Sequence, residues 1–308
     1  MSSPGSAPGA RVRVSATSAN LGPGFDSLGL ALDLYDELVV RVTPGVGVRV
    51  RVTGEGAGEV PDGEDHLVVR ALRHALKAVG ADQPDGLELV CHNAIPHGRG
   101  LGSSAAAVVA GVLAARCLLP QPEALDDETA LVVASDLEGH PDNAAAALLG
   151  GATIAWVDDC PRAVRVEPHP ALAALVAVPE ERLATRHARS VLPASVRHDD
   201  AARNVGRSAL LVEALTRRPD LLLPATEDRL HQRQRASAMP ATVQLVEALR
   251  KRGVAAVVSG AGPTVLVLTS ADRLDADAAV LQSVAPTGWR TRQLAVQRAG
   301  ASADRCQA

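Results

Sequence analysis

The segment IPHGRGLGSSAAAVVAGVLAA, residues 95–115, decides how the rest of the chain is interpreted. Its first half is rich in glycine, its second half is small and apolar like a buried helix, and the strand-like segment LELVCHNAI leads directly into it. A glycine-rich turn between a strand and a helix exposes the first N–H groups of that helix. These groups carry the positive end of the helix dipole, about half an elementary charge. The segment therefore predicts a phosphate-binding loop.

The composition of the loop strengthens this prediction. Gly98, Gly100 and Gly102 allow the backbone to approach oxygen atoms closely. Ser103 and Ser104 place hydroxyl groups at the helix start, where they can cap the helix, bind phosphate or bind Mg²⁺. The alternative is an ordinary strand-to-helix turn with a serine cap, and three glycines against an alanine-rich helix make it the weaker interpretation.

The loop lacks the lysine of the GxxxxGK[ST] pattern, and the only lysines of the chain are Lys77 and Lys251. The charge of a triphosphate must then be met by backbone dipoles, by arginine or by a metal ion. We therefore expect an acidic metal ligand elsewhere in the sequence.

The overall composition of the chain excludes several classes of function. A chain of 308 residues that is 47% hydrophobic is long enough for two domains. The net charge of −4 and the absence of a basic stripe with interleaved aromatic residues predict no nucleic-acid partner. The four cysteines form no CxxC pair, which argues against a zinc site and against a disulfide framework and favours a cytoplasmic protein. No run of about 20 apolar residues is present, so no membrane partner is expected.

Periodicity divides the first half of the chain into short elements after a disordered tail over residues 1–10. Expected strands are 11–17, a pair at 35–44 and 47–54 joined near residues 44–47, then 87–95, 152–157 and 163–168. Expected helices are 65–80, 103–118, 122–137 and 142–149.

A boundary is expected near residues 155–170, where prolines and charges interrupt the pattern. The predicted domains are thus 11–160 and 161–308. Beyond the boundary we expect strands at 172–179, 254–260, 264–270 and 288–296, helices at 200–217 and 240–252, and a further helix before the last strand. This order predicts an α+β fold with helices covering one face of antiparallel sheets.

Four segments together resemble the GHMP kinases, the family of galactokinase, homoserine kinase, mevalonate kinase and phosphomevalonate kinase. GRGLGSSAAA at 98–107 resembles the second motif of the family, and VVSGAGPTVLVL at 257–268 resembles the third. ATSANLGPGFDSLGLALDLYDEL at 16–38 resembles the first motif in its homoserine kinase form. LEGHPDNAAAALLGG at 137–151 resembles the short homoserine kinase version of the segment after the phosphate loop. The segments stand in the family's order and cover residues 11–270.

The resemblance implies two α+β domains with the active site between them: an N-terminal ATP-binding domain related to domain 2 of ribosomal protein S5, and a ferredoxin-like C-terminal domain. It implies ATP as phosphoryl donor and Mg²⁺ held by Glu138 and Ser104. The implied ATP-binding residues are Pro96, His97, Gly98, Arg99, Gly100, Leu101, Gly102, Ser103, Ser104 and Ala105.

The implied reaction is phosphorylation of the L-homoserine hydroxyl to O-phospho-L-homoserine, in threonine biosynthesis from aspartate. Homoserine is a zwitterion, so its pocket needs a cationic group for the carboxylate and acceptors for the ammonium. The positions that match the family's amino-acid contacts are Asn20, Asp26, His140, Asp142, Asn143, Thr185, Arg189, Arg235 and Gly260. Arg233 stands two residues before Arg235, and this segment departs from the commoner form, which has a tyrosine directly before the arginine.

The expected mechanism is direct attack of the homoserine hydroxyl on the γ-phosphorus, because a loose transition state needs little help from a base. The catalytic residues are then Asn143, which orients the hydroxyl, with Glu138 and Ser104 at the metal, and Asp26 binds substrate. Two alternatives stay open: a kinase of the same family acting on mevalonate, a sugar or another small alcohol, and a nucleotide-binding sensor without activity. A homodimer is expected, because homodimers are common in the family.

Overall fold

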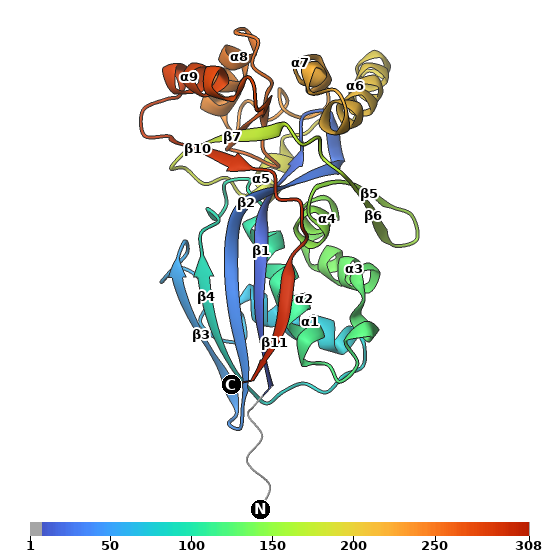
Figure 1. The fold of residues 1–308 in the computed structure, drawn as a ribbon, viewed down its shortest axis with the longest axis vertical. Helices are drawn as coiled ribbons and strands as arrows, with labels where there is room; N and C mark the ends of the chain where they lie inside the picture. The colour runs from blue at the N-terminus through green and yellow to red at the C-terminus, as the bar shows by residue number, and fades with distance from the viewer. Residues whose placement is uncertain (1–7, 308) are drawn as a thin grey trace, which may run out of the picture.

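Two β-sheets organise the described part of the chain, one of seven strands and one of four (Figure 1). The computed structural model describes residues 8–307. The larger sheet contains β1 (Pro8–Asn20), β2 (Gly24–Thr43), β3 (Gly47–Gly54), β4 (Gly86–Asn93), β5 (Ala152–Val157), β6 (Pro161–Val166) and β11 (Ser302–Gln307). Helices on one of its faces are α1 (Leu67–Ala78), α2 (Ser103–Leu118), α3 (Asp127–Glu138) and α4 (Asp142–Leu149).

The larger sheet has the strand order β11-β1-β2-β4-β3, and β5 pairs with β2 and with β6. All of its pairs are antiparallel except β3 and β4, which run parallel with α1 as the crossover between them. The predicted strands at 35–44 and 47–54 are present as parts of β2 and β3. They do not pair, because β4 lies between them.

The smaller sheet has the order β10-β7-β9-β8 and lies above the larger one in Figure 1. Its strands are β7 (Leu172–Val178), β8 (Ala256–Val258), β9 (Val265–Ser270) and β10 (Arg290–Ala295). The other elements of this half are α5 (Thr185–Ser190), α6 (His198–Thr216), a short 3₁₀ helix (Pro219–Leu221), α7 (Leu222–Ala225), α8 (Pro240–Arg250) and α9 (Leu274–Val284).

Strand β7 of the smaller sheet is buried on both faces. Along β7, Ala174 and Val176 join the main core shared with the larger sheet, while Leu175 and Ala177 join a second core with α8 and α9. Side chains of a strand point alternately to opposite faces, so a run with no polar position is the pattern of a doubly covered strand. The continuous apolar run LAALVAV is explained by this burial.

The structure confirms the predicted α+β class and corrects several boundaries. Pro8, Gly9 and Ala10 were expected in a disordered tail, but they belong to β1 and pair with β2 and β11. Ala10 is fully buried between these two strands, which explains why this part of the chain is ordered. Residues 1–7 of that tail lie outside the described part of the chain. The predicted helix 122–137 is a 3₁₀ turn (Pro122–Leu125) followed by α3, because Asp126 caps a new helix by accepting the N–H of Thr129.

The predicted division at residue 160 does not coincide with the two sheets. It falls within the β5–β6 hairpin, and the chain end returns to the larger sheet as β11, an element the sequence did not predict. Within residues 8–307, no helix has the length and apolar character needed to cross a membrane.

Candidate active site

The loop between β4 and α2 is held tightly against two other segments. Gly102, at the start of α2, has a φ of 72°, and a Cβ atom added there would lie 1.9 Å from Oγ1 of Thr17. A Cβ atom at Gly100 would lie 2.3 Å from the carbonyl oxygen of Ser259. No side chain fits at either position, so β1 and the third motif fix the path of the loop. The first N–H groups of α2 have no partners within the helix and are free to meet oxygen atoms.

Two side chains of the loop have anchoring roles. Arg99 donates from Nε to the carbonyl oxygen of Pro179 at 2.9 Å and from Nη2 to that of Glu180 at 2.6 Å, and its Nη1 donates to the carbonyl of His97 at 3.1 Å. Leu101 is buried in the main core. Any part that Arg99 and Leu101 play in ATP binding is therefore left to their backbone groups.

One cavity, of about 280 Å³, gathers most of the predicted residues. It is lined by Asn20, Gly98, Gly100, Gly102, Ser103, Ser104, Ala105, Leu137, Glu138, His140, Asp142, Asn143, Leu183, Thr185, Arg189, Arg235, Gly260 and Ala261. Of the predicted set, Pro96, His97, Arg99, Leu101 and Asp26 lie outside this lining. We call this space the central cavity.

Glu138 and Ser104 contact each other directly after the glycine-rich loop. Glu138 is the last residue of α3, and its Oε1 accepts a hydrogen bond from Ser104 Oγ at 2.5 Å. Burial raises the pKa of Glu138 above its ordinary value, although the hydrogen bond from Ser104 opposes this. A desolvated carboxylate beside a phosphate loop is a site where a cation would be stabilising.

The side chain of Asn143 is held by a hydroxyl on one side and by a carboxylate on the other. Its Oδ1 accepts from Thr17 Oγ1 at 2.8 Å, and its Nδ2 lies 3.3 Å from Oδ1 of Asp142. Asp142 also accepts the N–H of Asn143 at 2.7 Å and contacts His140 Nδ1 at 2.7 Å, and this hydrogen bond raises the pKa of His140. An ionised carboxylate can only accept, so it sets the orientation of the amide. Thr17, which the sequence analysis did not single out, completes the arrangement.

The first motif is tied to the C-terminal half by Asn20 and Asp26. Asn20 Nδ2 donates to the carbonyl of Gly260 at 2.9 Å, and its Oδ1 accepts the N–H of Asp26 at 2.9 Å. Both oxygens of Asp26 pair with Arg189 of α5, at 2.8 and 3.0 Å. Asn20 and Asp26 have φ values of 68° and 54°, in the left-handed region. Two residues that were predicted to bind substrate separately, Asp26 and Arg189, thus bind each other.

Arg235 is the buried cation of the central cavity. It is 1% exposed, and its Nε donates to the carbonyl of Ala188 at 3.1 Å. Its Nη1 donates to the carbonyl of Gly260 at 3.3 Å and lies 3.1 Å from Nδ1 of His231. Within residues 8–307 it makes no ion pair, and its Nη2 makes no hydrogen bond. Burial, and then the charge of Arg189, lower its pKa.

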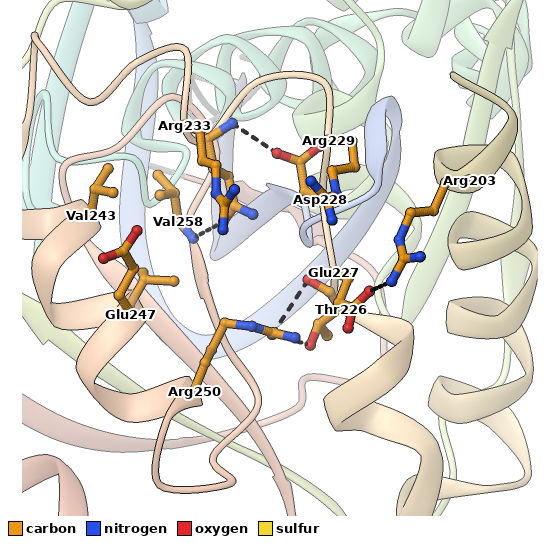
Figure 2. A pocket seen from close by; sticks show the side chains of 12 residues that line it. Arg203, Thr226, Glu227, Asp228, Arg229, Arg233, Val243, Glu247, Arg250 and Val258 are labelled. Carbon is orange, nitrogen blue, oxygen red and sulfur yellow. Dashed lines mark hydrogen bonds and ion pairs between the residues drawn. The ribbon is translucent and has the colours of Figure 1, made fainter. Parts of the chain in front are cut away.

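The structure separates Arg235 from its neighbour Arg233. Arg233 is exposed and lines a different cavity, together with Arg229 and Arg250, in which Arg203 pairs with Glu227 (Figure 2). Of the two arginines, Arg235 is therefore the one that faces the predicted substrate site.

Comparisons with known proteins identify the family of this chain. Residues 66–151 match the GHMP kinases N terminal domain, and residues 209–287 match the GHMP kinases C terminal domain. The homoserine kinase of Streptomyces coelicolor is 55% identical over 95% of this chain and 93% of its own. That of Mycobacterium tuberculosis is 51% identical over 93% of this chain and 92% of its own. The chain belongs to the homoserine kinases of the GHMP kinase family.

Solved structures agree with this membership. The homoserine kinase of Cytophaga hutchinsonii superposes with a TM-score of 0.84 at 26% identity, covering 99% of both chains. The mevalonate kinase of L. major superposes with a TM-score of 0.69 at 18% identity, covering 94% of this chain and 96% of its own, which shows a shared fold alone. The predicted GHMP kinase fold is confirmed.

This member of the homoserine kinases has a second cavity, whose surface is largely apolar. It adjoins the central cavity, because Ser103 and Ser104 line both. Its walls come from β2, β4, the segment before α1 and the first turn of that helix, the loop before α2 and the first turns of α2. They comprise Asp36, Glu37, Leu38, Val60, Pro61, Asp65, His66, Leu67, Val68, Cys91, Asn93, His97, Ala106, Ala107 and Ala110.

Proposed function

We propose that this chain transfers the γ-phosphoryl group of ATP to the hydroxyl of L-homoserine, and that the central cavity holds both reactants. The observation that carries the assignment of the site is Arg235, a buried guanidinium without a carboxylate partner beside a phosphate loop. Burial of a charge costs free energy unless the charge is paired, so we expect an anionic group of the substrate to bind this guanidinium. The product is O-phospho-L-homoserine, an intermediate in threonine biosynthesis from aspartate.

The zwitterion fits the charges of the cavity. The free Nη2 of Arg235 meets the carboxylate of homoserine, since guanidinium groups bind carboxylates through directed N–H bonds. The carboxylate of Asp142, which lines the cavity, supplies the negative charge that an ammonium group needs. Thr185 and Gly260 complete the lining on this side.

The phosphates of ATP lie against the start of α2, where free N–H groups and the hydroxyl of Ser104 face the cavity. Glu138 and Ser104 fit a Mg²⁺ ion, because Mg²⁺ takes one or two carboxylates and completes its shell with phosphate oxygens and water. Among the described residues, no three His, Cys, Asp or Glu side chains cluster to hold a metal by themselves, in keeping with a site that phosphates complete. When bound there, Mg²⁺ supplies positive charge to the transferred group.

The residues around Asn143 define its role. With Oδ1 held by Thr17, the Nδ2 group is the part of the amide left to contact the homoserine hydroxyl oxygen and point it at the γ-phosphorus. The new bond joins the homoserine oxygen to phosphorus as the bond to the β-phosphate oxygen breaks, and the hydroxyl proton passes to a phosphoryl oxygen. Phosphoryl transfer is largely a matter of position and charge, so no strong base is required. Because both oxygens of Asp26 accept from Arg189, Asp26 is a poor proton acceptor and takes no part as a base.

The apolar cavity is the place we assign to the adenine ring. Ser103 and Ser104, beside the loop that would hold the phosphates, line it, and its surface is mainly apolar. None of the four Phe, Tyr and Trp side chains of the chain lines it, so aliphatic contacts replace aromatic stacking. The expected cytoplasmic location and homodimer stay predictions.

The test is an ADP-release assay with MgATP against L-homoserine, mevalonate, galactose, L-threonine and homoserinol, which lacks the carboxylate. Arg235→Met should raise the KM for homoserine about 10- to 150-fold, because a hydrogen bond to a charged group is worth about 1.5–3 kcal/mol. Homoserinol should react poorly with the wild type and be little affected by the substitution.

The matched control is Arg233→Met, two residues away in the other cavity, which should leave the KM for homoserine unchanged. Turnover of another alcohol in preference to homoserine would replace the substrate assignment. ATP binding without turnover of any alcohol would favour the sensor. Equal effects of the two arginine substitutions would remove Arg235 from the substrate site.

A further inference from the structure

His231 is a fully buried side chain that contacts Arg235 and lies outside every motif of the sequence analysis. Its Nδ1 lies 3.1 Å from Nη1 of Arg235, and its Nε2 lies 2.8 Å from the carbonyl oxygen of Gly22. The ring stacks on Phe25, the only phenylalanine of the chain, at a centroid distance of 5.0 Å. Gly22 and Phe25 belong to the first motif, so His231 joins that motif to the substrate arginine.

The two contacts determine the protonation of the ring. A guanidinium can only donate, so Nδ1 of His231 must be an acceptor without a proton. A carbonyl oxygen can only accept, so Nε2 must carry the proton and donate to Gly22. His231 is therefore neutral, in the tautomer with hydrogen on Nε2. Burial lowers its pKa, which agrees with this assignment.

The turn that carries His231 is held rigidly. Asp228 accepts the N–H groups of Leu230, His231 and Gln232 at 2.9, 3.2 and 2.8 Å. The side chain of Gln232 in turn accepts the N–H of Val258, the last residue of β8, at 2.6 Å. These hydrogen bonds hold the imidazole beside the guanidinium.

We propose that His231 is a positioning residue for homoserine binding, and this proposal rests on the proposed function above. Its Nδ1 holds Nη1 of Arg235, and the carbonyls of Ala188 and Gly260 hold the rest of that edge of the guanidinium. Three acceptors on Nε and Nη1 leave Nη2 as the nitrogen that faces the substrate carboxylate. His231 therefore acts on selection of the α-carboxylate and not on phosphoryl transfer itself.

Two substitutions of His231 separate its two hydrogen bonds. In His231→Asn, the side-chain oxygen takes the place of Nδ1, so the acceptor for Arg235 is retained and the donor to Gly22 is lost. In His231→Gln, the amide nitrogen takes the place of Nε2, so the donor to Gly22 is retained and the acceptor for Arg235 is lost. Both variants remove the ring and its stacking on Phe25, which makes each the control for the other.

We expect His231→Gln to raise the KM for homoserine about 10-fold or more, from the loss of a hydrogen bond to a charged group. Its kcat and its KM for ATP should stay within about 3-fold of the wild type, and its preference for homoserine over homoserinol should fall. His231→Asn should keep a KM for homoserine near that of the wild type. Equal rises of KM in both variants, or no rise in His231→Gln, would overturn the proposal.

The wild-type protein supplies a measurement that does not depend on the folding of a variant. ¹⁵N-labelled histidine in the free enzyme should show the ring of His231 neutral, with hydrogen on Nε2 and none on Nδ1. A proton on Nδ1 would contradict the contact with Arg235. Failure of the wild type to phosphorylate homoserine would instead remove the proposed function, which the same kinetic series measures directly.

Discussion

Replacement of Thr17 by valine tests whether the orientation of Asn143 matters for phosphoryl transfer. Thr17 is fully buried, and valine has nearly the same shape, so the substitution removes a hydroxyl without opening a cavity. The hydroxyl donates to Asn143 Oδ1 at 2.8 Å, and its loss leaves that oxygen unsatisfied beside the cavity. An unsatisfied buried acceptor costs about 1–3 kcal/mol.

If this whole cost appears in the transition state, kcat falls about 5- to 150-fold, since about 1.4 kcal/mol corresponds to a factor of ten. The KM for homoserine and the KM for ATP should change little, because Asn143 acts mainly on the attacking hydroxyl. The assay is ADP release coupled to a second enzyme, together with direct quantification of O-phospho-L-homoserine. A ratio of ADP to phosphorylated product above one would show that misplaced hydroxyl groups let water react.

Thr17→Ser is the matched control, because it keeps the hydroxyl and removes only a methyl group. It should retain most of the wild-type kcat. The reasoning is refuted if folded Thr17→Val has a kcat within about 2-fold of the wild type, or if Thr17→Ser loses as much as Thr17→Val. Thermal unfolding of both variants separates loss of turnover from loss of the fold.

Three further outcomes are expected. Glu138→Gln should lower kcat about 10- to 100-fold and raise the Mg²⁺ concentration needed for half-maximal turnover, because a charged metal ligand is lost; an unchanged Mg²⁺ titration would contradict the role of Glu138. Ala107→Leu should raise the KM for ATP about 5-fold or more by filling the apolar cavity, at an overpacking cost of about 1–3 kcal/mol, while an equal rise for homoserine would contradict the adenine assignment. Burial raises the pKa of Asp36 from 3.8 to about 6, so its ionisation is harder in the folded state and stability is lost as pH rises from about 4 to 6. Asp36→Asn should therefore raise the free energy of unfolding at pH 7 by about 3 kcal/mol and have no such effect below pH 4, which denaturant titrations at both pH values would check.

Local patterns in the sequence predicted most of the helices and strands. Helix α2 begins and ends where the small apolar run predicts, and the three glycines of the loop adopt the left-handed backbone that only glycine adopts freely. The homoserine kinase motifs stand in one order along the chain, and each can be recognised from its own residues. These features are short in range, so neighbouring residues are enough to specify them.

Only the tertiary structure decided which residues far apart in the sequence contact each other. Asp26 and Arg189 are 163 residues apart, and no local pattern indicates that they pair. Arg233 and Arg235 look equivalent in the sequence, yet the turn anchored by Asp228 exposes one and buries the other over His231. The sequence by itself determined the family, the glycine-rich loop before α2 and the identities of the charged groups. Which of those charges are neutralised by the protein and which are left for substrate depends on packing between the two sheets, because a side chain's partner is set by distance in space and not by its neighbours in the chain.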